Sequence, residues 1–103
     1  MAKVFIMHKL KKGASMEDYR KWSPEDQRVS RSHPNVKDFR VYEIKGGKQG
    51  KIPFDLIEVE EVKDWETHQD VVRSESIKRM EKTWLDKYVD RDSLVVLYGE
   101  EIK

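Results

Sequence analysis

One histidine and one aspartate are the residues of this sequence best suited to proton transfer. His68 follows Trp65 at helical spacing on an apolar stripe that continues to Val72, and imidazole titrates near neutral pH. Asp26 lies on a similar stripe nearer the N-terminus, where its carboxylate could orient a histidine or accept a substrate proton. We interpret His68 and Asp26 as candidate catalytic residues. The structural alternatives are a core histidine bonded to backbone and an aspartate that caps a helix or pairs with Arg28.

A second set of residues suits the binding of a flat aromatic molecule. Aromatic rings can stack on such a ligand, and an arginine can bind its carboxylate or enolate oxygen. Each also has a structural alternative: the rings can be core, His8 can mark the exit of a strand into solvent, and Arg40 can pair across strands with Glu58 or Glu60. The candidate ligand-binding residues are His8, Tyr19, Trp22, Arg40, Tyr42 and Trp65.

Other kinds of site are excluded or poorly supported. The chain has no cysteine, which excludes disulfides, thiolate metal sites and cysteine nucleophiles. Asp64 and His68 are spaced i, i+4 and could touch one ion, but two ligands do not make a metal site. The glycine-rich residues 46–51 lack phosphate-loop spacing, because Lys45 and Ile52 stand where glycine and Ser/Thr are required. We therefore expect neither a metal nor a cofactor.

The composition is that of one small, highly charged domain spanning residues 1–103. Charged residues make up 40%, yet 21 Lys+Arg and 20 Asp+Glu leave a net charge of +1, which argues against a DNA-binding protein. Carboxylates on residues 55–61 would repel RNA phosphates. The longest apolar run, Leu94–Tyr98, is far shorter than the about 20 residues of a membrane span. We expect a cytoplasmic protein without a nucleic-acid or membrane partner.

Alternating and helical periodicities divide the chain into six elements. The predicted strands are residues 2–10, 36–44, 54–62 and 93–101, and the predicted helical segments are residues 16–33 and 64–88. Pro24 lies inside the first helical segment and predicts a kink or a new helix start. The apolar stripe of the second segment is interrupted at residues 73–76, which predicts two short helices or one broken helix.

The order of these elements predicts a ferredoxin-like α+β fold, the split β-α-β arrangement of four antiparallel strands with helices on one face. The other sheet face is normally wet, but the first and last strands are apolar on both sides. Scattered exposed apolar side chains are common on sheets. Here the pattern is continuous and no further layer of helices is available, so we expect a sheet-to-sheet homodimer.

Three segments carry a resemblance to a known family: Met16–Trp22, Ser32–Val36 and Phe39–Glu43. They are similar to the aromatic-bearing first helix, the proline-marked turn and the second strand of the dimeric α+β barrel superfamily, and the resemblance covers nearly the whole chain. Within it the chain resembles the small RedY/HapK-like proteins of prodiginine biosynthesis, with EthD-like proteins and antibiotic-biosynthesis monooxygenases as relatives. EthD-like members often carry a histidine where this chain has Asp26, so no EthD-type site is expected.

The resemblance implies a homodimer of secondary metabolism with a small-molecule pocket between helices and sheet. Such pockets enclose roughly a few hundred Å³. The expected function is a cofactor-independent tailoring enzyme that condenses, cyclises or oxygenates an aromatic or polyketide-like molecule. Two alternatives remain open: a non-catalytic ligand-binding or accessory protein with the same pocket, and an interaction domain without one.

Overall fold

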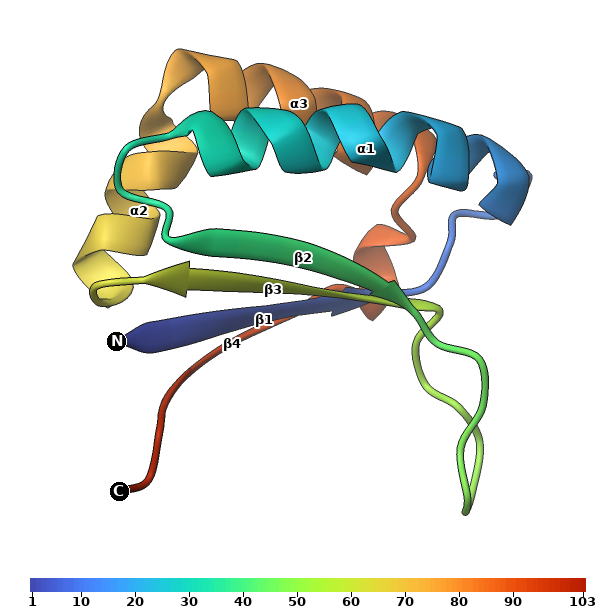
Figure 1. The fold of residues 1–103 in the computed structure, drawn as a ribbon. Coiled ribbons are helices and arrows are strands. Elements are labelled where there is room, and N and C mark those ends of the chain that lie inside the picture. Colours follow the sequence, from blue (N-terminus) through green and yellow to red (C-terminus); the bar gives the residue numbers. More distant parts are fainter.

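Four strands and three α-helices follow one another in the order that the sequence predicts, and the computed structural model describes residues 1–103. The strands pair antiparallel in the order β2-β3-β1-β4, which is the ferredoxin-like arrangement. The helices all lie on one face of this sheet (Figure 1), so the predicted α+β fold is confirmed. The elements are β1 (Ala2–His8), α1 (Met16–Ser32), β2 (Asp38–Glu43), β3 (Leu56–Val62), α2 (Trp65–Arg73), α3 (Glu75–Lys87), a 3-10 turn (Arg91–Ser93) and β4 (Val95–Glu100).

Helix α1 runs without a break through Pro24, so the prediction of a new helix start there is wrong. Ser15 caps the helix, because its hydroxyl accepts a hydrogen bond of 3.1 Å from the backbone N–H of Asp18. Pro24 is exposed, and a carbonyl that loses its helical partner on the exposed side can bond to water instead. The unbroken helix aligns four buried residues along the side that faces the sheet: Tyr19, Ser23, Asp26 and Ser30.

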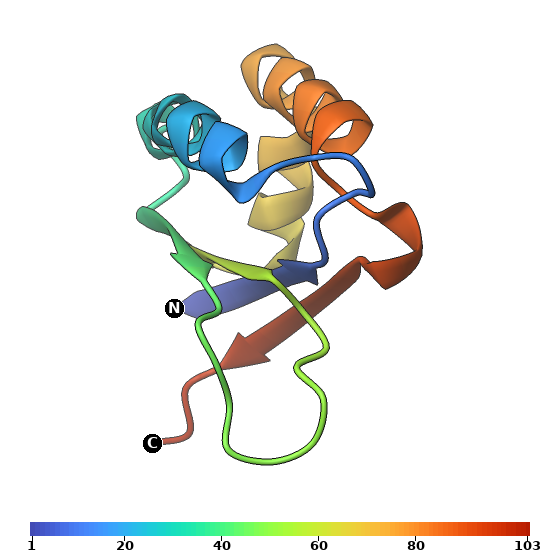
Figure 2. The ribbon, with the colours of Figure 1, turned by 90° about the vertical axis from the view of Figure 1, so that its right-hand side faces the viewer.

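The second helical segment is broken, as its interrupted stripe predicts. Helix α2 ends at Arg73 and α3 begins at Glu75, with Ser74 between them. The hydroxyl of Ser74 donates a hydrogen bond of 2.7 Å to the carbonyl of Val71. This bond gives a partner to one of the backbone carbonyls at the end of α2. The break lets α2 cover one end of the sheet while α3 runs beside α1 (Figure 2). Side chains from three helices can therefore converge over β3.

The space between helices and sheet holds two apolar clusters rather than one uniform core. The first contains Val4, Val36, Phe39, Val62, Val71 and Ile77, and the second contains Tyr19, Leu56, Trp84 and Val89. Strand β3 contributes Leu56 to one cluster and Val62 to the other. Between them its alternation turns Glu58 and Glu60 toward the helices. A polar stretch is therefore buried between the two clusters.

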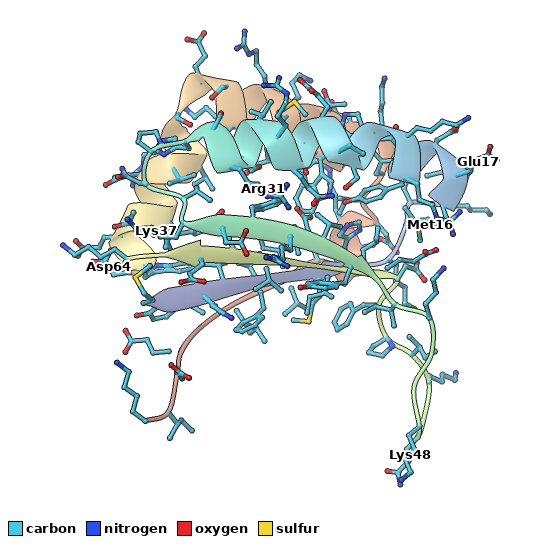
Figure 3. The ribbon with its side chains drawn as sticks, viewed as in Figure 1. Met16, Glu17, Arg31, Lys37, Lys48 and Asp64 are labelled. Carbon is cyan, nitrogen blue, oxygen red and sulfur yellow. The ribbon has the colours of Figure 1, made fainter.

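Much of the sheet face opposite the helices is apolar, as the sequence predicts, and no part of this chain covers it. Strand register places two mainly apolar rows across this face, Tyr42–Ile57–Met7–Val95 and Arg40–Val59–Phe5–Leu97. A charged row, Asp38–Glu61–Lys3–Gly99, crosses the same face at one end. The hairpin loop between β2 and β3 and the C-terminal residues project beyond the sheet on this side (Figures 1 and 2). Figure 3 shows Lys48 at the tip of that loop. The chain contains no helix with the length and apolarity that a bilayer crossing requires.

Candidate functional site

A small cavity lies between the three helices and the sheet, in a space that side chains otherwise fill (Figure 3). Its volume is about 50 Å³, which is room for a few water molecules or one functional group. It is smaller than the pocket of roughly a few hundred Å³ that the sequence led us to expect. Its polar lining consists of Asp26, Ser30, Glu58, Glu60, His68 and Glu81, and its apolar lining of Ile6, Phe39, Val72, Ile77 and Trp84.

A carboxylate–histidine pair is the closest polar contact in this cavity. Nδ1 of His68 on α2 lies 2.8 Å from Oε1 of Glu60 on β3, and the two side chains are 8% and 5% exposed. When Nδ1–H donates to this carboxylate, the lone pair of the neutral imidazole is on Nε2. Nε2 makes no hydrogen bond within the chain. The pair therefore has the form of an oriented general base.

Two further carboxyl groups in the cavity have no counter-charge. Asp26 and Glu58 are 7% and 4% exposed, and no lysine or arginine lines the cavity. Burial raises the pKa of Asp26 to about 7. Burial, followed by the charges of Asp26 and Glu60, raises the pKa of Glu58 well above its usual range. Near neutral pH the two groups therefore retain at least part of their protons.

The expected structural alternative for Asp26 is not realised. Arg28 lies on the exposed side of α1 and pairs with Glu25 instead. Asp26 is buried in the middle of the helix rather than at its start, so it is not a cap. The neighbouring carboxyl of Glu58 offers no opposite charge, because its own ionisation is opposed by that of Asp26.

A cluster of rings contains three more buried polar atoms. The rings of His8 and Trp84 meet edge to face at 5.1 Å, and those of His8 and Tyr19 lie 6.0 Å apart. His8 Nε2, the Tyr19 hydroxyl and Trp84 Nε1 have no hydrogen-bond partner. His8 is fully buried, so its alternative role as the exit of β1 into solvent is wrong. Burial lowers the pKa of His8, and Nδ1 then donates to the carbonyl of Lys9 at 2.9 Å.

Arg40 and Tyr42 lie away from the cavity, on the opposite face of the sheet. Arg40 stands opposite Val59 in the register, so it cannot reach Glu58 or Glu60, whose side chains turn to the helices. The predicted cross-strand pair is therefore wrong, and Arg40 pairs with Asp38 at 2.7 Å.

The two half-buried tryptophans among the candidates flank the site at different ends. Trp65 lies beside His68, with 5.0 Å between the two ring centroids, and its ring is 5.6 Å from that of Tyr98. Trp22 lies 5.1 Å from the ring of Tyr88 on the other side of the molecule. The aromatic candidates therefore do not form one stacking platform.

Sequence reasoning missed Glu60 and Glu58 as site residues. The signal is the alternation of Leu56, Glu58, Glu60 and Val62, which puts two carboxylates between two apolar residues on the same face of a strand. Asp64 is used elsewhere, because its side chain accepts a 2.8 Å hydrogen bond from the N–H of Thr67 at the start of α2. No three histidine, aspartate or glutamate side chains are arranged to hold a metal ion.

Comparisons with known proteins agree with this architecture. The family model for REDY-like protein HapK matches residues 2–102, whereas no curated protein matches the chain. An EthD family protein from Bacillus halodurans has a TM-score of 0.77 at 20% identity, covering 99% of both chains. HapK from Hahella chejuensis has a TM-score of 0.78 at 16% identity, covering 99% of this chain and 93% of that one. A dimeric ferredoxin-like protein from Thermobifida fusca has a TM-score of 0.76 at 8% identity, covering 97% and 90%.

Proposed function

The chain belongs to the REDY-like HapK family, and we propose that it binds a small molecule and acts on it as a cofactor-independent tailoring enzyme. The proposed substrate is an aromatic or polyketide-like metabolite of a secondary pathway. The observation that carries the proposal is the buried pair of His68 and Glu60 beside a cavity, with Nε2 of His68 unoccupied. An oriented imidazole next to an internal space is the arrangement that proton abstraction requires.

The proposed chemistry is a proton transfer that allows condensation or cyclisation. Nε2 of His68 takes a proton from a substrate carbon next to a carbonyl, and the carboxylate of Glu60 stabilises the imidazolium through Nδ1–H. The imidazolium then returns this proton to the developing oxygen anion, so the step is balanced by His68 alone. General acid–base catalysis of this kind contributes roughly 10²- to 10⁴-fold.

The small volume of the cavity restricts how a substrate can bind. A cavity of about 50 Å³ holds only the reacting end of an aromatic molecule. We propose that the rest of the molecule lies against Trp65, whose half-buried ring already stacks on His68.

We propose a homodimer in which two copies cover each other's apolar sheet face. Leu97 and Tyr42 on this face are 52% and 48% exposed in the single chain, and the two rows that contain them are otherwise almost entirely apolar. A twofold dimer removes both faces from water at once. The proposed location is the cytoplasm, because a chain without cysteine needs no oxidising compartment.

A non-catalytic ligand-binding or accessory protein that uses the same pocket is the second candidate, because a buried cavity with unpartnered polar atoms can hold a ligand without acting on it. The small volume of the cavity instead favours the third alternative, an interaction domain without a ligand pocket. Deuterium exchange into the methyl group of acetophenone, followed by NMR, separates the first two functions. The enzyme accelerates exchange; His68→Ala abolishes the acceleration, and His33→Ala at the end of α1 retains it. Binding of acetophenone without accelerated exchange would support the accessory protein instead.

A further inference from the structure

The cavity is strongly acidic and contains no cation to balance it. Four carboxyl groups reach it from three elements: Asp26 from α1, Glu58 and Glu60 from β3, and Glu81 from α3. The lining contains no lysine or arginine, and the imidazole of His68 is bonded to Glu60 alone. Asp26 and Glu58 therefore have no partner of opposite charge within the chain.

Unsatisfied polar atoms in the same place indicate that something from outside completes the cavity. Glu58 is 4% exposed, lines the cavity, and has one carboxyl oxygen without a hydrogen-bond partner. Trp84 also lines the cavity, and its buried indole N–H makes no hydrogen bond within the chain. Buried polar groups without partners destabilise a fold, so a ligand is a physical reason for keeping them.

We propose that the cavity receives a cationic nitrogen group of the ligand, such as a primary ammonium or an amidinium, held by Asp26 and Glu58. This inference rests on the proposed small-molecule function and specifies the group that enters the site. Several N–H donors on one cation can serve two carboxylates at once, whereas a neutral hydroxyl donates a single hydrogen bond. A ligand carboxylate or phosphate would be repelled by all four acidic side chains.

The small volume of the cavity fits a cationic nitrogen group. A space of about 50 Å³ admits a group of a few heavy atoms and no aromatic ring. The apolar remainder of the ligand can extend past Val72 and Ile77, which line the same cavity from α2 and α3, toward Trp65, which packs on the same apolar cluster. The carboxyl groups would thus bind the nitrogen group of the ligand, and the apolar side chains would contact the rest of the molecule.

Affinity for the cation should rise with pH, because Asp26 must release its proton to bind an ammonium or amidinium group. Burial places the pKa of Asp26 at about 7. The titratable groups that face it are Glu58 and Glu60 on β3, Glu81 on α3, and His68 on α2. Binding should therefore be weaker at pH 6 than at pH 8.

Titration of the isotope-labelled protein with three matched probes at pH 8, followed by amide NMR shifts, tests the inference. Benzamidine should bind at least about tenfold tighter than benzyl alcohol, and benzoate should not bind. Asp26→Asn and Glu58→Gln should each remove this preference, whereas Glu25→Gln, an exposed neighbour on α1, should retain it. Thermal melting verifies that the variants are folded, which we expect because the wild-type carboxyls have no partners to lose.

Equal affinities for benzamidine and benzyl alcohol, or no binding of benzamidine, would overturn the inference. So would an Asp26→Asn, Glu58→Gln double variant that keeps the preference for the cation. If benzyl alcohol binds in the cavity and benzamidine does not, this inference fails, but the proposed small-molecule function is not contradicted. If the protein does not accelerate deuterium exchange into acetophenone, by contrast, the catalytic proposal is contradicted and the inference of a cation-binding cavity is not.

Discussion

Nδ1 of His68 lies 2.8 Å from Oε1 of Glu60, and the contact joins the middle of α2 to the middle of β3. The two residues are eight positions apart, with the turn between β3 and α2 in the intervening chain. Glu60 turns toward the helices because it shares the phase of Leu56 and Val62 along β3. Its carboxylate therefore sets the tautomer of His68 rather than forming a surface ion pair.

Glu60→Gln should lower exchange into acetophenone by roughly 100-fold, with little change in binding. The amide keeps the volume of the carboxylate but can donate to Nδ1, which would shift the proton of the imidazole to Nε2 and remove the base. The measurement is the exchange rate from pH 5 to pH 9, because a merely structural role would change melting temperature without altering the shape of the pH profile. Glu66→Gln on the exposed side of α2 is the matched control and should retain the wild-type rate.

The fold could be predicted from the sequence because its elements have distinct periods. Period-2 alternation marked the strands, and the interrupted apolar stripe at residues 73–76 marked the break that Ser74 makes between α2 and α3. Pro24 was misleading because a proline strongly disfavours a helix interior, yet the exposed side of α1 accommodates it.

The site could be predicted only in part, because periodicity assigns a residue to a face but not to a neighbour on another element. His68 and Asp26 were identified as polar residues on buried stripes, and both line the cavity. Glu58 and Glu60 were missed because carboxylates are usually assigned to solvent. Their partners come from helices, and only the packing of those helices on the sheet brings them together.

Asp26→Asn should stabilise the protein at pH 8 and have little effect at pH 4. The pKa of Asp26 is raised from an ordinary value of 3.8 to about 7 in the folded protein. The folded state therefore binds more protons than the unfolded chain between about pH 4 and pH 7, and the free energy of unfolding falls as pH rises through this window. The gain at pH 8 should be on the order of 2–4 kcal/mol.

Urea unfolding of Asp26→Asn and the wild type at both pH values measures this difference. Glu25→Gln, one position earlier on the exposed side of α1, should show no comparable pH-dependent gain. A variant less stable than the wild type at pH 8 would mean that the carboxylate of Asp26 has a stabilising partner after all.

Pro24→Ala should raise the free energy of unfolding by about 1–3 kcal/mol. Position 24 lies in the interior of α1, where alanine restores a backbone donor and removes the clash of the proline ring with the preceding turn. The side chain is exposed, so the substitution disturbs no packing. Thermal or urea unfolding checks the gain, and a loss of stability would show that α1 needs the proline at this turn.

Leu97→Lys should convert a dimer into a monomer. Leu97 stands beside Phe5 and in the same row as Val59, so a lysine there places a charge in the apolar row of the face that we propose is shared. Burying a charge without a partner is costly, and the substitution occurs twice in a twofold dimer. We expect the dissociation constant to rise at least about 100-fold.

Light scattering coupled to size-exclusion chromatography, at micromolar protein concentration, tests whether Leu97→Lys dissociates the dimer. The wild type should give a particle of twice the 12.3 kDa protomer mass, and Leu97→Lys a particle of the protomer mass. Val96→Lys is the control, because Val96 is the preceding residue of β4, is 42% exposed, and stands beside Ile6 on the opposite face of the sheet. A wild-type particle of 12.3 kDa would show that this sheet face is exposed to water and that the protein is a monomer.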